Sequence, residues 1–210
     1  MSDKNNKIAS ENMSMNFSKG WGIILYQALM FFLLIGFSID GLNIVAPAFS
    51  ESSGVDYPSV LSMATIAGFI GIVVYIFAGR VNVKVGPRIM SGACLIGAGL
   101  SYIFLGRTST LATYCIALTL VTCFINSAAY IAGNTLIAQW FPKKKGLANG
   151  FTTMGHNCGS AFYVPLVSAA IAAFGFANGL SLLALIAIAL GVVGLVFVRN
   201  TPPGGRDVSR

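Results

Sequence analysis

The fold class follows from one stretch, Pro58–Arg80, which reads PSVLSMATIAGFIGIVVYIFAGR. No charged residue occurs in it before Arg80. A helix of about 20 apolar residues spans the hydrocarbon core of a bilayer, which is about 30 Å thick. A strand of a membrane barrel needs only about 10 residues and alternates apolar with polar side chains, and this stretch does not alternate. The stretch therefore predicts a transmembrane helix.

The composition of the whole chain agrees with a membrane protein. Of its 210 residues, 56% are hydrophobic and only 9% are charged, against about a quarter charged in soluble domains. So few ionised side chains cannot cover a water-facing surface, which excludes a soluble monomer. We predict an all-α integral membrane protein, a bundle of six transmembrane helices over 21–198 between a disordered cytoplasmic tail at 1–20 and a cytoplasmic C-terminal tail at 199–210. The predicted helices are 21–48, 58–80, 88–106, 110–141, 147–174 and 178–198.

The distribution of charge predicts the orientation of these helices. Thirteen Lys and Arg against six Asp and Glu give a formal net charge of +7. The basic residues flank the apolar runs, which suits membrane lipid headgroups better than nucleic acid. In a six-span topology twelve of them fall on one side and only Arg107 on the other. Because Lys and Arg are retained on the cytoplasmic side, we expect both termini to be cytoplasmic, in the cytoplasmic (inner) membrane of a bacterium.

A short internal repeat relates the two halves of the predicted bundle. Sliding the chain by 92 residues aligns SIDGLNIVAPAF (38–49) with YIAGNTLIAQWF (130–141), with four identities in twelve positions. The offset places the first predicted helix on the fourth. An odd number of spans in each unit gives the two copies opposite orientations, so the alignment predicts the inverted three-plus-three repeat of secondary transporters.

Polar side chains within the predicted spans indicate which helices face a cavity, since polar groups are costly against hydrocarbon. In the run 110–141 they recur at spacings of three and four, on one stripe of a helix. The runs 147–174 and 21–48 carry similar polar faces. Two interpretations stay open: these side chains line a substrate cavity, or they join neighbouring helices without a ligand. The cavity candidates are Tyr26, Asn126, Tyr130, Asn134, His156 and Tyr163.

Two titratable residues are candidates for a further role. Asp40 is the only acidic residue within a predicted span and has no basic partner at helical spacing. A low dielectric favours the protonated form of an unpaired carboxyl group, so Asp40 is the candidate for proton coupling. Alternatively, water reaches Asp40 in the outer half of its helix and keeps it ionised. His156 is a proton carrier, a substrate contact or a packing residue.

The sequence contains no arrangement typical of an enzyme or of a metal site. Ser, His and acidic residues form no recognisable catalytic set, and no phosphate-binding loop is present. The four Cys form no C-x-x-C pair, and the chain has a single His. We therefore expect no catalytic residue, no metal and no cofactor.

The segment 79–88 reads GRVNVKVGPR and joins the second and third predicted helices. It resembles the cytoplasmic signature of the major facilitator superfamily, G-x-x-x-D-[RK]-x-G-x-[RK]-[RK]. The matching positions lie in register, but Val83 stands where the family has Asp, and Ile89 where it often has a second basic residue. The resemblance implies a cytoplasmic gating loop. In the family the Asp of this loop helps to latch the two halves of the transporter together, and this chain has Val83 in its place. The matching residues are Gly79, Lys84, Gly86 and Arg88.

The loop WFPKKKGLANG (140–150) is similar to the corresponding stretch of the oxalate/formate antiporter and monocarboxylate porter branches. The string RNTPP (199–203) is similar to the place where the first six-helix half of those porters ends. The resemblance implies a half-transporter that moves a small organic anion, a mono- or dicarboxylate, by alternating access. It also implies a partner, a second six-helix unit supplied by a homodimer or a separate C-terminal half. The alternative is a truncated, non-transporting membrane subunit or scaffold that binds a partner.

Overall fold

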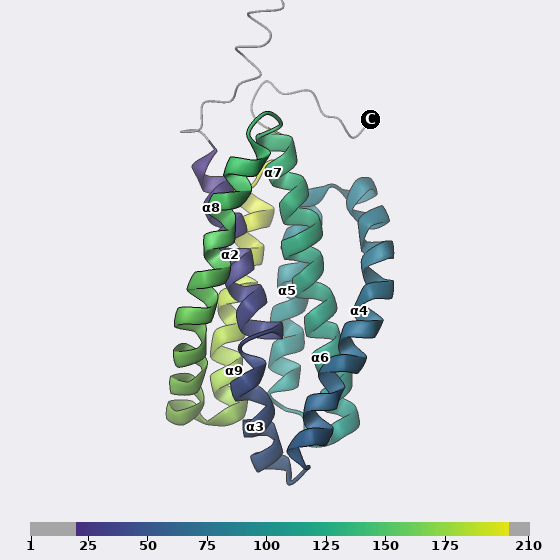
Figure 1. Cartoon of the computed structure of the whole chain (residues 1–210), viewed down its shortest axis with the longest axis vertical. Coiled ribbons are helices and arrows are strands. Elements are labelled where there is room, and N and C mark those ends of the chain that lie inside the picture. Colours follow the sequence, from purple (N-terminus) through teal and green to yellow (C-terminus); the bar gives the residue numbers. More distant parts are fainter. Residues whose placement is uncertain (1–19, 202–210) are drawn as a thin grey trace, which may run out of the picture.

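The computed structural model describes residues 20–201, so most of the two predicted tails, at 1–19 and 202–210, lies outside the described residues. Within the described range the ordered structure is helical (Figure 1). Five helical segments are long and apolar enough to cross a membrane. The chain is therefore a helical membrane protein, as the sequence predicts. The segments are Trp21–Ser53, Tyr57–Val85, Pro87–Leu105, Leu111–Trp140 and Lys145–Phe197.

The first segment is interrupted, although the sequence predicts one helix over 21–48. Helix α2 (Trp21–Ser38) ends at Ile39, whose φ of −126° and ψ of −93° are not helical. Helix α3 (Leu42–Ser53) begins after Gly41. A side chain at Gly41 would collide with the carbonyl oxygen of Gly36, so the break depends on a glycine there.

Short capping signals set the limits of the next two helices. Asp56 accepts the backbone N–H of Ser59 at 3.0 Å and begins α4 (Tyr57–Val85). Hydrogen bonds from the Ser59 hydroxyl and backbone lower the pKa of the Asp56 carboxyl below its ordinary value. At the other end Gly86 has a φ of 88°, a left-handed value that favours glycine, and α5 (Pro87–Leu105) starts immediately after it.

The remaining segments each contain a wider π-helical turn, in which hydrogen bonds span five residues instead of four. Helix α6 (Leu111–Asn126) passes through η2 (Ser127–Gly133) into α7 (Asn134–Trp140). Helix α8 (Lys145–Cys158) passes through η3 (Gly159–Tyr163) into α9 (Val164–Phe197). Segment η3 ends two residues before Pro165, which has no N–H to donate to the preceding turn.

The last segment turns back on itself. Gly175 lies inside α9 with a φ of 79° and a ψ of 168°, which no helix adopts. A Cβ on Gly179 would lie 2.8 Å from the carbonyl group of Ala170, whereas nine residues of straight helix separate two positions by about 13 Å. Lys145–Phe197 is therefore a helical hairpin that reverses at Gly175.

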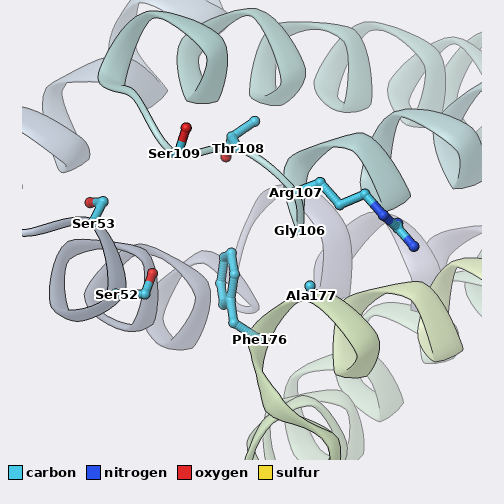
Figure 2. A pocket seen from close by; sticks show the side chains of 8 residues that line it. All are labelled: Ser52, Ser53, Gly106, Arg107, Thr108, Ser109, Phe176 and Ala177. Carbon is cyan, nitrogen blue, oxygen red and sulfur yellow. The ribbon is translucent and has the colours of Figure 1, made fainter.

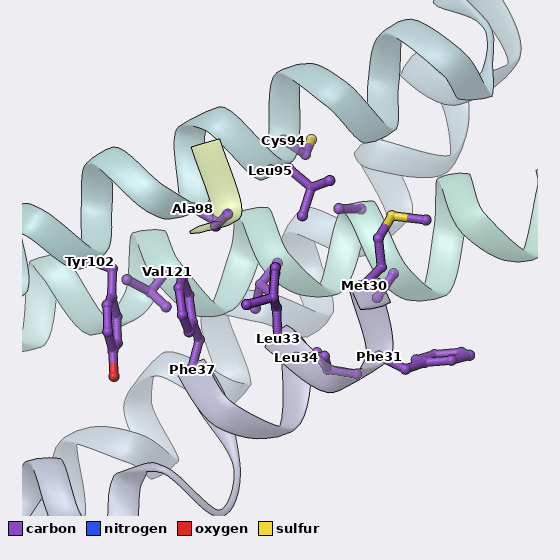
Figure 3. Close-up of a cluster of buried hydrophobic side chains, with 14 of the residues drawn as sticks. Met30, Phe31, Leu33, Leu34, Phe37, Cys94, Leu95, Ala98, Tyr102 and Val121 are labelled. Atoms are coloured by element: carbon purple, nitrogen blue, oxygen red, sulfur yellow. The ribbon is translucent and has the colours of Figure 1, made fainter. Parts of the chain in front are cut away.

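The core lies where α2 meets α5, α6 and α9 (Figures 1 and 3). The Phe37 ring of α2 stacks on the Tyr102 ring of α5 with centroids 3.9 Å apart and planes 5° apart. Leu33 and Leu34 of α2 are also buried in this cluster. Helix α4 contributes little to the core, since only five of its 29 residues are buried.

Candidate functional site

The structure brings together two of the predicted cavity residues, Tyr130 of η2 and His156 of α8, around Phe31 of α2. The His156 ring meets the Phe31 ring edge-on at 4.4 Å between centroids, and Tyr130 lies 5.6 Å from Phe31. The Tyr130 and His156 rings are 6.1 Å apart. Tyr130 is 42% exposed and His156 is half-buried, so both rings border the surface of the bundle. We call Phe31, Tyr130 and His156 the aromatic site.

Two asparagines stand at the ends of the π segment that carries Tyr130. Asn126 precedes η2; its Nδ2 donates to the Thr122 carbonyl at 2.7 Å, and it also hydrogen-bonds to Tyr75 of α4. Asn134 follows η2 and is half-buried. Asn126, Tyr130 and Asn134 thus lie on and beside a π segment, and not along the regular helix that the predicted stripe assumes.

Tyr26 and Tyr163 lie elsewhere, in packed interior positions. The Tyr26 hydroxyl of α2 donates to the Ser91 hydroxyl of α5 at 3.2 Å, on the side that faces Gly194 of α9. The Tyr163 hydroxyl donates to the Tyr102 hydroxyl at 3.3 Å, and its ring packs on α2. Both tyrosines are almost fully buried, and the structure does not bring them to the aromatic site.

Asp40 lies in the break between α2 and α3, and not within a helix. Its side chain is half-buried, and its backbone carbonyl accepts the N–H of Asn43 at 3.1 Å.

Gln27 of α2 is a further polar residue beside η2, and the sequence analysis does not identify it. Its side chain is completely buried, and its Nε2 donates to the Ala129 carbonyl of η2 at 2.8 Å and approaches Asn134 Oδ1 at 3.4 Å. The available signal was a lone amide within the apolar run of α2. It belongs to no polar stripe, and so a search for periodic stripes passes over it.

The predicted gating loop joins the ends of α4, α5 and α9. Arg88 donates from Nε to the Leu195 carbonyl at 2.9 Å, with its terminal NH2 on the same oxygen, and so caps the end of α9. Asn200 accepts the backbone N–H of Arg88 at 2.9 Å. Gly86 supplies the left-handed turn, whereas Gly79 and Lys84 lie on α4, with Lys84 exposed.

A pocket of about 420 Å³ lies at the opposite end of the bundle, near the α9 reversal (Figure 2). Arg107 borders it, but the guanidinium points away and donates to Ile103 and Ser181 at 3.2 and 3.1 Å. The pocket is thus separate from the aromatic site. Over residues 20–201, no three His, Cys, Asp or Glu side chains are placed to hold a metal ion. The pocket is lined by Ser52, Ser53, Gly106, Arg107, Thr108, Ser109, Phe176 and Ala177.

Comparison with known families accounts for this arrangement of helices and loop. The model of the Major Facilitator Superfamily matches residues 28–210, which is most of the chain. The chain belongs to this superfamily. Its members are membrane transporters and not enzymes, and the signature residues at 79–88 lie in the matched region.

One curated relative is similar to part of this major facilitator chain. The chain is 36% identical over 90 residues to the oxalate:formate antiporter of Oxalobacter formigenes. The matched stretch covers 42% of this chain and 21% of that antiporter. The resemblance to the oxalate/formate branch is therefore confirmed, over a part of each protein.

Proposed function

We propose that this chain forms one six-helix unit of a secondary transporter that moves a small organic anion, a mono- or dicarboxylate, by alternating access. The observation that carries the proposal is the aromatic site, where a tyrosine hydroxyl and an imidazole from different helices border the surface of an otherwise apolar bundle. The similarity to an oxalate:formate antiporter supports a carboxylate as the substrate class.

The proposed unit crosses the membrane six times as an inverted three-plus-three repeat. The reversal at Gly175 supports two crossings within Lys145–Phe197. Irregular backbone occurs at related places in the two copies, because the break at 39–41 corresponds through the 92-residue offset to 131–133 at the end of η2. Discontinuous helices at corresponding positions of two repeats are typical of substrate sites in transporters.

A second six-helix unit completes the proposed pathway, as further helices of a longer protein, a second copy or a separate chain. Helix α4 presents large apolar side chains such as Phe69, Ile72 and Phe77, each more than half exposed. Tyr130 and His156, by contrast, need protein or water, since polar groups are costly against lipid. A partner over these faces encloses the aromatic site, with the basic loops and both termini on the cytoplasmic side of a bacterial inner membrane.

The chemistry of the aromatic site suits an anion that needs hydrogen-bond donors. The Tyr130 hydroxyl and the His156 imidazole are donors suited to a carboxylate oxygen, and the Nε2 of His156 is buried without a partner among the described residues. No Lys or Arg stands in the interior of the predicted spans, so the balancing positive charge comes from the second unit. Asp40, at the helix break, is the proposed site of proton coupling.

Counterflow in proteoliposomes tests the proposal. We expect vesicles loaded with oxalate, with the second unit present, to exchange labelled oxalate or formate, and Tyr130→Phe and His156→Gln to reduce the exchange about tenfold each. Tyr57→Phe, at the start of α4, is the matched control and retains the wild-type rate. A chain that binds a second unit and carries neither anion is a scaffold, and the proposal would then be wrong.

A further inference from the structure

The side chain of Gln27 connects α2 to the π segment η2. It is 0% exposed, although a primary amide has two donors and an acceptor to satisfy. Its Nε2 donates to the Ala129 carbonyl at 2.8 Å and lies 3.4 Å from Asn134 Oδ1. The amide therefore joins a backbone carbonyl inside η2 to the first residue after it.

The main chain of η2 leaves room for this amide only because residue 133 is a glycine. A Cβ on Gly133 would overlap the Gln27 amide, with the Oε1 atom nearest. That Oε1 is buried and accepts no hydrogen bond among the described residues. A buried acceptor without a donor is costly. The favourable part of this arrangement is therefore the hydrogen bond from Nε2 to the Ala129 carbonyl.

Nε2 holds the backbone next to Tyr130. Ala129 precedes Tyr130 directly, and Phe31, one helical turn beyond Gln27 on the same face of α2, contacts the Tyr130 ring. Helix α2 thus contacts η2 at two points, the Ala129 carbonyl and the Tyr130 ring. A π segment is a local distortion that tertiary contacts must maintain.

We infer that Gln27 is a positioning residue: it fixes the π segment η2 against α2 so that the Tyr130 ring faces His156. The inference rests on the proposed function insofar as the aromatic site binds the anion. The geometry of η2 can be tested without transport.

His156 provides the test, because it is the only histidine of the chain. Its imidazole NMR signals, in protein purified without a histidine tag, report the ring currents of Phe31 and Tyr130. We expect Gln27→Met, which keeps the length but removes both donors, to shift these signals. Ser91→Ala removes another buried hydrogen bond of α2, the one from Tyr26, and should leave them in place.

Gly133→Ala approaches the same contact from the other side. We expect it to shift the His156 signals in the direction seen for Gln27→Met, and the double variant to add little, because residues that share one contact are not additive. Gly68→Ala, on the open side of α4, is the matched control. If Gln27→Met fails to fold, Gly133→Ala alone decides the inference.

Transport kinetics separate positioning from general destabilisation. We expect Gln27→Met to raise the KM for oxalate about tenfold, the ratio expected for about one lost hydrogen bond, with kcat changed less. Unchanged His156 signals in both variants overturn the inference. Shifted signals in a protein that carries no anion uphold the positioning of Tyr130 and refute the proposed function.

Discussion

Helices α4 and α5 follow each other in the chain and reverse the pattern of burial of a soluble protein. Helix α4 is the more apolar of the two, yet only five of its 29 residues are buried. Helix α5 buries eleven of its 19 residues, and these include Ser91, Gly92, Gly99 and Ser101. Burial in these two helices therefore does not follow hydropathy, because lipid is as apolar as leucine and a large apolar side chain can face it without cost.

Close approach of the backbones explains why α5 is the buried one. A Cβ on Gly99 would lie 2.6 Å from Ile188 and 2.8 Å from the Ala184 carbonyl of α9. A Cβ on Gly92 would lie 2.5 Å from Leu195. On α4, by contrast, Gly68 and Gly79 have nothing within 4 Å of the same position. The α5 and α9 backbones thus meet through glycines, whereas Gly68 and Gly79 of α4 face open space.

The largest expected effect is a leucine in the α5–α9 contact. Gly99→Leu has no space against Ile188, and we expect it to destabilise the bundle by about 1–3 kcal/mol, as overpacking does. Gly68→Leu, the same change on α4, should leave the stability unchanged. Thermal unfolding in a mild detergent measures both. Equal melting temperatures for the two variants would refute the contrast between the helices.

The next effect concerns association through the exposed face of α4. We expect the chain to have the mass of at least two copies in mild detergent, or to bind a second six-helix unit supplied with it. Gly68→Trp should reduce this mass without lowering the melting temperature of the unit, because the tryptophan projects from the open face. Light scattering after gel filtration gives the mass. A wild-type monomer that takes up no partner would contradict the proposed second unit.

Removing the cap that Arg88 places on α9 should have a smaller effect. Arg88→Ala leaves the Leu195 carbonyl without its donors, and we expect a loss of about 1 kcal/mol, since Arg88 is half-buried. Arg88→Lys should recover part of the loss, because it keeps the charge but not the fork of donors. Lys84→Ala, on the exposed end of α4, is the control. Urea unfolding that gives Arg88→Ala the wild-type midpoint would exclude the cap.

The smallest effect is at the start of α4, where Asp56 caps the helix. Its pKa is lower in the folded protein than the ordinary 3.8, so the cap is complete above that ordinary value and is lost as the pH falls through the folded pKa. Below the folded pKa, we expect the Ser59 amide to exchange its hydrogen faster in the wild type than in Asp56→Asn, because asparagine keeps the acceptor and does not titrate. A ratio of these two exchange rates that stays the same at all pH values would contradict a titrating cap.

The long apolar runs and the loop signature could be predicted from the sequence, because length, charge and a tight turn are local properties. The break at Ile39–Gly41 could not, since it depends on how Gly41 meets Gly36 in the folded chain. Spacing along a helix shows that polar residues share a face, but it does not show whether that face packs against another helix or lines a cavity. Tyr26 and Tyr163 therefore have the predicted periodicity and still pack inside, against Ser91 and Tyr102.

The contact of Trp140 with the end of α9 provides an optical probe. Its Nε1 donates to the Arg199 carbonyl at 2.8 Å. The next residue, Asn200, accepts the backbone N–H of Arg88. The chain has only two tryptophans, the other being Trp21. With Trp21 replaced by Phe, the emission of a single indole would report, in real time and without a label, whether the segment after α9 stays bound or detaches.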